Sequence, residues 1–298
     1  MHPVRRYFAK RLSLLAILSA AAFALGQLGA WHWFAELFAH FLPHYATVWL
    51  AAALLCAGRQ RLLWTVFALA AACWLAQPYS AWQRQPENAG AAAQTLVWYN
   101  VNLDNPDAAA ESRALLAENA DALALAEIDL ADGGWQHLRT AYPHGCEHRE
   151  DSPFALALWF RQPPQSCTVH TVETEAGGFV YIRAEFAGTT VYALHPPPPV
   201  SGTLSAARDR YLAEAAAHIR RERKVLAVGD FNDTFSAPSM RRFDTDAGGL
   251  DNTLPHIVPT WLPFGLHIDH ILGRNAAVSA RPLPWRHSDH RPIAVRWR

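Results

Sequence analysis

Hydrophobic and polar residues follow two different patterns along the chain. Three early runs of more than 20 residues carry no formally charged side chain, whereas the later part alternates short hydrophobic stretches with polar turns. A run of that length can cross the hydrocarbon core of a bilayer, about 30 Å thick, as a helix. The first 84 residues are therefore predicted to form a membrane region with three transmembrane helices, at about residues 12–34, 40–58 and 62–80.

Basic residues indicate how this region is oriented. Four of them lie between positions 5 and 11, before the first run, and Arg59 and Arg61 separate the second run from the third as a tight basic turn. Under the positive-inside rule the N-terminus and this turn lie in the cytoplasm, so everything after the third helix lies outside. A cleaved signal peptide over residues 1–30 is the competing interpretation, but two further hydrophobic runs follow it.

The remainder of the chain has the pattern of a separate domain. Residues 85–94 are typical of a linker, and the domain is predicted over residues 95–298. Helical periodicity occurs at 108–119 and 205–223. Many strands with few helices between them predict an α/β (α+β) sandwich, in which helices flank two packed mixed sheets. The expected strands are 95–99, 122–126, 155–160, 179–186, 189–194, 225–228, 267–272 and 293–297.

Polar side chains gather where these strands end. The clearest case is the run 225–228, which leads into Gly229, Asp230 and Asn232. Glycine would allow a tight turn there, and residues two apart on an extended chain point to the same side. If the strands share one core, such residues converge on one rim. The other members of this set are Asn100, Asn102, Glu127, Asp129, His195, Asp269, Asp289 and His290.

Composition supports a membrane region joined to a water-soluble domain. Of the 298 residues, 51% are hydrophobic and 17% charged, with a formal net charge of zero. Before Pro86 the only acidic residue is Glu36, so the later part is acidic, which argues against non-specific binding of nucleic acid. Cys146 and Cys167 lie in the part predicted to be outside, and we expect them to form a disulfide in that oxidising compartment.

Six short motifs occur in the order found in the endonuclease/exonuclease/phosphatase superfamily, and the chain resembles the bacterial membrane-anchored members of this DNase I-like group. The resemblance covers roughly residues 95–298, and the ordered set is far more specific than any one motif. The motifs are YNVN (99–102), AE (126–127), LH (194–195), GDFN (229–232), IDHIL (268–272) and SDHRP (288–292).

The resemblance implies a metal site. Glu127 matches the principal Mg²⁺ ligand, with Mn²⁺ as the alternative ion, since hard cations favour carboxylate oxygens. Asn100 matches the first-strand asparagine near the metal, and Asp289 a ligand or a supporting carboxylate. The family usually has glutamine before the metal-binding glutamate, and Ala126 stands there instead. This departure puts a supporting hydrogen bond in doubt; Asn102 is a candidate to supply it.

The resemblance also implies catalytic roles. His290 matches the general base for the attacking water or the group that holds the phosphoryl oxygen, and both assignments stay open. Asp269 would accept a hydrogen bond from its other ring nitrogen. Asp230 would orient or activate the water, Asn232 would donate to the phosphoryl oxygen, and His195 would donate to the phosphate. Asn102 and Trp261 are expected near the rim as substrate-binding residues, while His270 is expected to be structural.

The predicted function is that of a membrane-anchored, Mg²⁺-dependent phosphoric ester hydrolase of phosphodiesterase, nuclease or phosphatase type. Its substrate would be nucleic acid, a phospholipid head group or a small phosphate ester. The lipid bilayer is the expected partner, and no protein partner is predicted. The expected location is the bacterial inner membrane, with several spans and the catalytic domain facing the periplasm. The alternative is a catalytically silent, membrane-anchored binding module of the same fold. A transporter is not favoured, because the predicted spans carry no buried acid or base except interfacial histidines.

Overall fold

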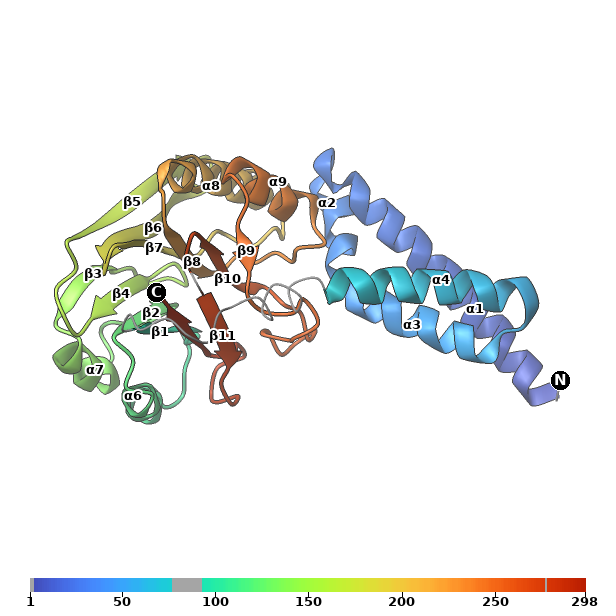
Figure 1. The fold of residues 1–298 in the computed structure, drawn as a ribbon, viewed down its shortest axis with the longest axis horizontal. Coiled ribbons are helices and arrows are strands. Elements are labelled where there is room, and N and C mark those ends of the chain that lie inside the picture. The colour runs from blue at the N-terminus through green and yellow to red at the C-terminus, as the bar shows by residue number, and fades with distance from the viewer. Residues whose placement is uncertain (1–2, 77–92, 277) are drawn as a thin grey trace.

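The computed structural model describes residues 3–76, 93–276 and 278–298. It consists of a β-sandwich with helices on its outer faces, from which a bundle of N-terminal helices extends to one side (Figure 1). The first sheet has the strand order β11 (Val278–Pro282), β12 (Ile293–Trp297), β1 (Gln94–Asn100), β2 (Ala122–Ala126), β4 (Leu156–Phe160) and β3 (His144–His148). The second has the order β5 (Ser166–Thr174), β6 (Gly177–Phe186), β7 (Thr189–Leu194), β8 (Val225–Asp230), β10 (Asp269–Arg274) and β9 (Asp251–Asn252).

Both sheets are mixed, which confirms the predicted architecture. β1 pairs in parallel with β2 and antiparallel with β12, while β7 pairs in parallel with β8. Alternate residues of each strand face opposite sides. In β1, Leu96 and Trp98 enter the core between the sheets, whereas Val97 and Tyr99 belong to the cluster on the outer face. A strand buried on both faces explains the nearly continuous hydrophobic runs in the sequence.

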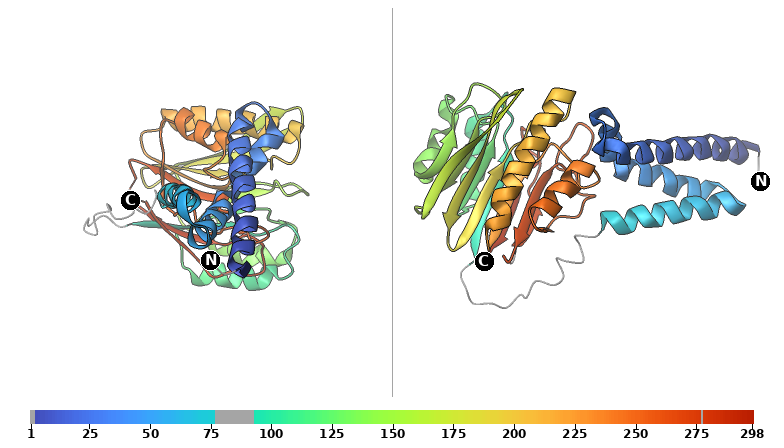
Figure 2. Two further views of the ribbon diagram at one scale, coloured as in Figure 1. Left: turned by 90° about the vertical axis from the view of Figure 1, so that its right-hand side faces the viewer. Right: turned by 90° about the horizontal axis from the view of Figure 1, so that it is seen from above.

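Helices cover the two outer faces. α6 (Ala108–Ala117), the short 3₁₀ turn η3 (Gly133–Trp135) and α7 (Gln136–Ala141) pack on the first sheet. The second sheet is covered by α8 (Gly202–Arg221) and α9 (Pro238–Asp246), as the view from above shows (Figure 2). Tyr211 of α8 is fully buried against this sheet. The predicted helices at 108–119 and 205–223 therefore correspond to α6 and α8 with shifted ends.

The expected disulfide is present. It joins Cys146 of β3 to Cys167 of β5, 21 residues apart in sequence. β3 and β5 are each the edge strand of their own sheet. The bond therefore links the two sheets along one edge of the sandwich. The chain between the two cysteines includes β4 and the crossing to the second sheet.

The N-terminal helices form a bundle with its own apolar contacts. The bundle contains α1 (Pro3–Gly26), η1 (Gln27–Ala30), α2 (Trp33–Glu36), η2 (Leu37–Phe41), α3 (Leu42–Leu55) and α4 (Gly58–Leu75). Two segments, Arg6–Ala30 and Trp33–Leu55, are long and apolar enough to cross a membrane by length and composition. The basic turn expected at Gly58 to Arg61 is instead the first turn of α4, and the chain reverses at Cys56 and Ala57. The linker expected at 85–94 lies mostly outside the described residues.

A buried polar cluster joins this bundle to the sandwich. The Arg208 guanidinium of α8 donates to Glu36 at 2.6 Å and lies 3.1 Å from an Asp233 oxygen. The backbone N–H of Ser239 donates to the other Glu36 oxygen at 2.8 Å. His40 lies 3.4 Å from Asp233. Arg208 and Asp233 have no exposed surface and Glu36 has 2%, so the junction is a desolvated charge cluster that includes the residue directly after Asn232.

Candidate active site

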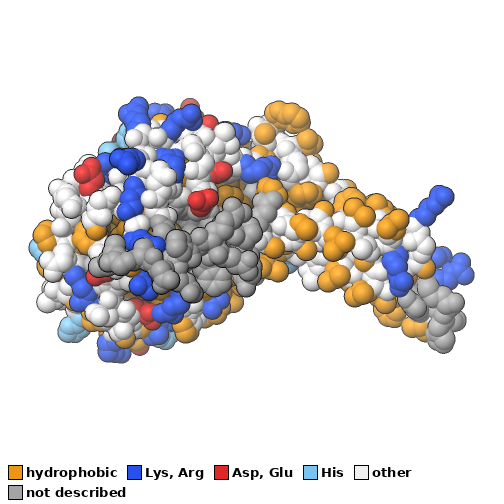
Figure 3. All heavy atoms as spheres, in the orientation of Figure 1, with side chains coloured by type: hydrophobic (Ala, Val, Ile, Leu, Met, Phe, Trp, Pro, Cys, Tyr) orange, Lys and Arg blue, Asp and Glu red, His pale blue; other side chains and the backbone are white. Residues whose placement is uncertain are grey.

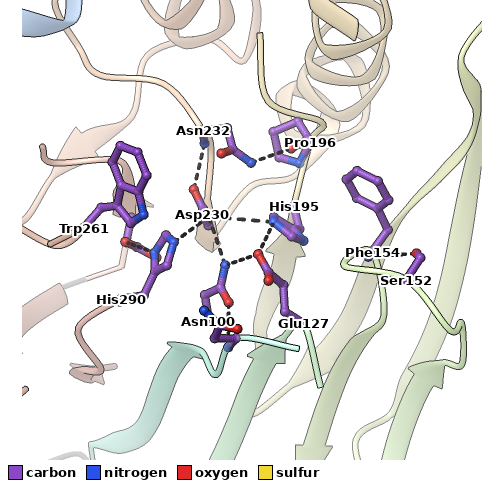
Figure 4. A network of polar contacts seen from close by, with 12 residues as sticks. Asn100, Glu127, Ser152, Phe154, His195, Pro196, Asp230, Asn232, Trp261 and His290 are labelled. Atoms are coloured by element: carbon purple, nitrogen blue, oxygen red, sulfur yellow. Dashed lines mark hydrogen bonds and ion pairs between the residues drawn. The ribbon is translucent and has the colours of Figure 1, made fainter. Parts of the chain in front are cut away.

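Strand pairing brings the expected polar residues together at one end of the sandwich. β1 and β2 run in parallel, so Asn100 at the end of β1 lies beside Glu127, which follows β2. β7 and β8 are likewise parallel and end near His195 and Asp230. β10 runs antiparallel to β8, and its first residue, Asp269, pairs with Asp230. Ends of strands far apart in sequence thus meet around one space (Figure 4).

Gly229 has a different role from the one expected. Its backbone shows no positive φ. A Cβ atom at this position would lie 2.3 Å from the carbonyl oxygen of Leu194 in β7. Glycine is therefore required because the two parallel strands approach closely at the point where their polar ends meet. The prediction of a tight turn at Gly229 was wrong.

The centre of the cluster is a set of carboxylates held by an amide. Asn100 donates from Nδ2 to Glu127 at 2.7 Å and to Asp230 at 3.1 Å. Its Oδ1 accepts from the backbone N–H of Asn102, which sets this orientation of the amide. His195 Nε2 lies 3.7 Å from oxygens of both Glu127 and Asp230. Glu127, His195 and Asp230 each offer one ligand atom, and these three atoms all lie within 4.8 Å of one another. Such a group can hold a metal ion.

A carboxylate–histidine pair lies next to this set. His290 Nδ1 bonds to an Asp269 oxygen at 2.9 Å, and Nε2 lies 3.5 Å from Asp230. Burial alone would lower the pKa of His290, but the nearby carboxylates of Asp269 and Asp230 outweigh it and raise that pKa to about 10. The imidazolium form therefore predominates at neutral pH. Burial raises the pKa of Asp230 to about 6, against the opposing influence of His290.

Asp269 is held by two residues that the sequence did not single out for this task. Trp98 donates from Nε1 to its second carboxylate oxygen at 2.8 Å, and the Thr260 hydroxyl accepts from its backbone N–H at 3.0 Å. A buried tryptophan N–H requires a hydrogen-bond acceptor. A tryptophan at a core position such as 98 therefore indicates that a polar partner lies nearby, although the sequence does not say which residue it is.

Asp289 belongs to neither of the two groups that could hold a metal ion, which are Glu127, His195 and Asp230, and Asp230, Asp269 and His290. One of its oxygens accepts from Asn102 Nδ2 at 2.8 Å and the other from Trp261 Nε1 at 2.9 Å. Asn102 and Trp261 thus hold this carboxylate beside His290. Likewise, Asn100 presents its amide nitrogen to Glu127, so in this arrangement it is a donor that positions the carboxylate.

Three non-glycine residues of the site have left-handed backbones. Their φ angles are 65° at Asn102, 55° at Glu127 and 52° at Asn232. Such conformations cost free energy and concentrate at functional sites. Asn232 also donates from Nδ2 to the carbonyl of Pro196 at 3.0 Å, and its N–H donates to Asp230 at 2.8 Å. The backbone thus turns each polar residue toward the shared space as its strand ends.

Other histidines and acids near the motifs have structural contacts. His270 bonds to the backbone carbonyl of Asp233 at 2.8 Å and is fully buried, as expected of a structural residue. His287 is held by Glu111 at 2.9 Å. Phe154, which the sequence did not single out, packs its ring against His195 with centroids 5.7 Å apart.

Comparison with known proteins defines the class. Residues 97–290 match the model of the endonuclease/exonuclease/phosphatase family, so the chain belongs to this family. It is accordingly an enzyme that hydrolyses phosphoric ester bonds. No curated protein matches the chain in sequence at a significant level.

Solved structures share the fold at low sequence identity. Sphingomyelinase C from Streptomyces griseocarneus is 16% identical with a TM-score of 0.52, covering 69% of this chain and 99% of its own. A 3′-5′ exonuclease from Neisseria meningitidis is 19% identical with a TM-score of 0.53, covering 68% and 98%. A mutant beta toxin from Staphylococcus aureus with bound magnesium ions is 15% identical with a TM-score of 0.54, covering 68% and 99%.

Proposed function

We propose that the protein is a membrane-anchored hydrolase that uses a divalent metal ion, Mg²⁺ or Mn²⁺, to catalyse attack of water on a phosphoric ester. The observation that carries the proposal is that a candidate metal-binding group and a carboxylate–histidine pair lie side by side at the ends of the strands. Glu127 and Asp230 supply carboxylates beside His195, and the Asp269–His290 pair lies 3.5 Å from Asp230.

The donor set fits a hard cation. Carboxylate oxygens are the ligands that Mg²⁺ prefers, and Glu127 is the proposed principal ligand, positioned by Asn100. Burial raises the pKa of Glu127, and a cation bound there would offset that cost of a buried negative charge. When bound, the ion would stabilise the charge that develops on the phosphoryl group. The magnesium ions of the staphylococcal neighbour agree with this proposal.

The protein groups divide the remaining tasks. Asp269 holds His290 Nδ1, which leaves Nε2 of the imidazolium to donate to a phosphoryl oxygen; the raised pKa of His290 favours this role over that of general base. Asp230, ionised in most molecules at neutral pH, accepts the proton of the attacking water. Asn232 uses one amide hydrogen on Pro196 and has a second for the phosphoryl oxygen. Asn102 and Trp261 position Asp289 at the edge of the site.

Removing either the metal or its principal ligand is expected to stop turnover. Full-length protein in detergent should hydrolyse a soluble phosphodiester such as bis(4-nitrophenyl) phosphate with Mg²⁺ and lose that activity in EDTA. Glu127→Gln should show the same loss with Mg²⁺ present, whereas Glu173→Gln, the same change at an exposed position of β5, should behave as wild type. Wild-type activity in Glu127→Gln would remove this residue from the site. No turnover by folded wild type would favour the silent binding module.

The N-terminal bundle is the proposed anchor. Figure 3 shows it as mostly hydrophobic on the visible face, with Lys and Arg side chains at the end far from the sandwich. That end includes Arg6, Lys10 and Arg59. A cytoplasmic position for these residues follows from the positive-inside rule and leaves the sandwich on the periplasmic side of a bacterial inner membrane.

A reporter fused after Arg298 tests this orientation. Alkaline phosphatase, which folds only in the periplasm, should be active there, and β-galactosidase should be inactive. Fusions placed between Cys56 and Gly58, at the reversal of the chain, should give the opposite pattern. An active β-galactosidase after Arg298 would reverse the proposed topology.

A further inference from the structure

The chain between β9 and β10 forms a hairpin with an exposed apolar tip. A bridge between Trp261 and Leu266 closes the hairpin, and the Gly265 N–H donates to the Leu262 carbonyl at 3.2 Å across the tip. Residues 262–264, Leu-Pro-Phe, are all exposed, with 61% of Leu262 and 55% of Phe264 accessible. These three residues are called the 262–264 tip below.

This tip is connected directly to the active site. The N–H of Leu262 donates to the Asp289 carbonyl at 2.8 Å. The preceding residue, Trp261, donates to the Asp289 carboxylate and forms a bridge with His290, and the rings of Trp261 and His290 lie 6.4 Å apart. A surface that binds the tip therefore lies next to His290, the residue proposed to bind the phosphoryl group.

The same tip touches the proposed membrane anchor. The rings of Phe264 and Phe41 pack perpendicular to each other with centroids 5.9 Å apart. Phe41 ends η2 and immediately precedes α3, within the apolar segment Trp33–Leu55. Figure 1 shows the loop between β9 and β10 on the side of the sandwich that faces the helical bundle. The tip thus lies where the apolar helices meet the sandwich.

A bilayer surface fits this position better than a soluble partner. The hairpin is hydrogen-bonded at both sides, so the exposed leucine and phenylalanine cannot fold back into the core. Burial of these two side chains in an apolar environment is favourable, and exposed apolar side chains grouped in this way mark an interaction site. The helices next to Phe41 are apolar enough to place the bilayer at the tip without any further component.

We infer that the substrate is a membrane phospholipid, whose phosphodiester enters the site from the bilayer surface along the 262–264 tip. This inference rests on the proposed function. In the reaction an oxygen–phosphorus bond forms from water, one ester oxygen–phosphorus bond breaks, and the leaving oxygen takes up a proton. The products are diacylglycerol with a phosphorylated head group, or phosphatidic acid with the head-group alcohol.

The test compares three substrates with one protein preparation. Full-length protein is reconstituted in vesicles of phosphatidylethanolamine and phosphatidylglycerol with Mg²⁺, and both lipid products are quantified. Bis(4-nitrophenyl) phosphate and supercoiled plasmid are offered in parallel. The variants are Leu262→Asp, Phe264→Asp and the double variant. Gln136→Asp is the matched control, because Gln136 is exposed on α7, at the end of the sandwich away from the bundle (Figure 1).

Wild type is expected to cleave the vesicle lipid. In the double variant the ratio of lipid turnover to soluble-ester turnover should fall by about tenfold or more, because two charged residues replace the apolar contact, while Gln136→Asp keeps the wild-type ratio. Turnover of the soluble ester without lipid turnover would overturn the inference and leave the proposed function intact. Preferential plasmid cleavage, or an unchanged ratio in the double variant, would also overturn the inference. No turnover of any substrate would overturn the proposed function itself.

Discussion

Replacement of His290 by alanine is expected to lower turnover of a soluble phosphodiester by about 10²- to 10⁴-fold, the range typical for loss of a positioned acid–base group. The change removes the ring that lies 3.5 Å from Asp230 and leaves one oxygen of the Asp269 carboxylate without its partner. The measurement is kcat of the full-length chain with Mg²⁺, together with circular dichroism to show that the fold persists. His137→Ala, an exposed histidine of α7, should retain wild-type kcat.

The variant Asp269→Asn distinguishes two effects of Asp269 on His290: holding the ring in position and favouring its protonated form. Its side chain keeps the shape of aspartate but no longer favours the imidazolium, so the pKa of His290 should fall from its raised value. If His290 acts as the charged donor, activity disappears as pH rises through that pKa, and the alkaline limb of the pH–rate profile should move to lower pH in the variant. An unchanged alkaline limb would contradict the donor role, and a near-normal kcat in His290→Ala would remove His290 from catalysis.

The residues of the candidate site could be found in the sequence because strands impose a simple rule on them. A buried hydrophobic run such as Val225–Val228 marks a strand inside the sheet. A polar residue that follows such a run lies near the end of the strand, and therefore at the rim of the sandwich. Asp230, Glu127 and His195 follow this rule. Their convergence depends on pairing between β1 and β2 and between β7 and β8, which hydrophobic patterning alone does not specify.

Elements with weak patterns were not predicted. β3 and β5 are edge strands whose residues are mostly half-buried, so polar residues occur on both faces and the period of two is lost. The supports of Asp269 were also missed. Trp98 reaches it across 171 residues of sequence, and no local rule predicts the acceptor of a buried indole.

The charge cluster at the junction is the largest feature that the sequence did not predict. In the sequence Glu36 stands out only as the single acid of the first 85 residues, and its partner Arg208 lies 172 residues away on an amphipathic helix. A charged side chain on such a helix normally faces water. Here the bundle covers this part of α8, and the charge is neutralised by the buried carboxylates of Glu36 and Asp233 together with the more exposed Asp209.

Arg208→Ala is therefore expected to destabilise the sandwich by about 3–5 kcal/mol, because it leaves two buried carboxylates without a counter-charge. The measurement is the unfolding midpoint of detergent-solubilised protein. Arg281→Ala is the matched control, since Arg281 of β11 forms a solvent-exposed pair with Glu118 at 3.0 Å, away from the cluster, and such pairs contribute about 0–1 kcal/mol. Equal losses in the two variants would show that the cluster at Arg208 is solvated.

Removing the whole cluster distinguishes an unpaired charge from lost packing. The triple variant Arg208→Met, Glu36→Gln and Asp233→Asn removes all three buried formal charges of this cluster, so most of the stability lost in Arg208→Ala should return. Activity need not return with it. Asp233 follows Asn232 directly, its carbonyl accepts from His270, and its carboxylate is tied through Arg208 to the bundle. A stable triple variant with reduced kcat would show that the charges position the Asp230–Asn232 turn, whereas full recovery of both would limit their role to stability.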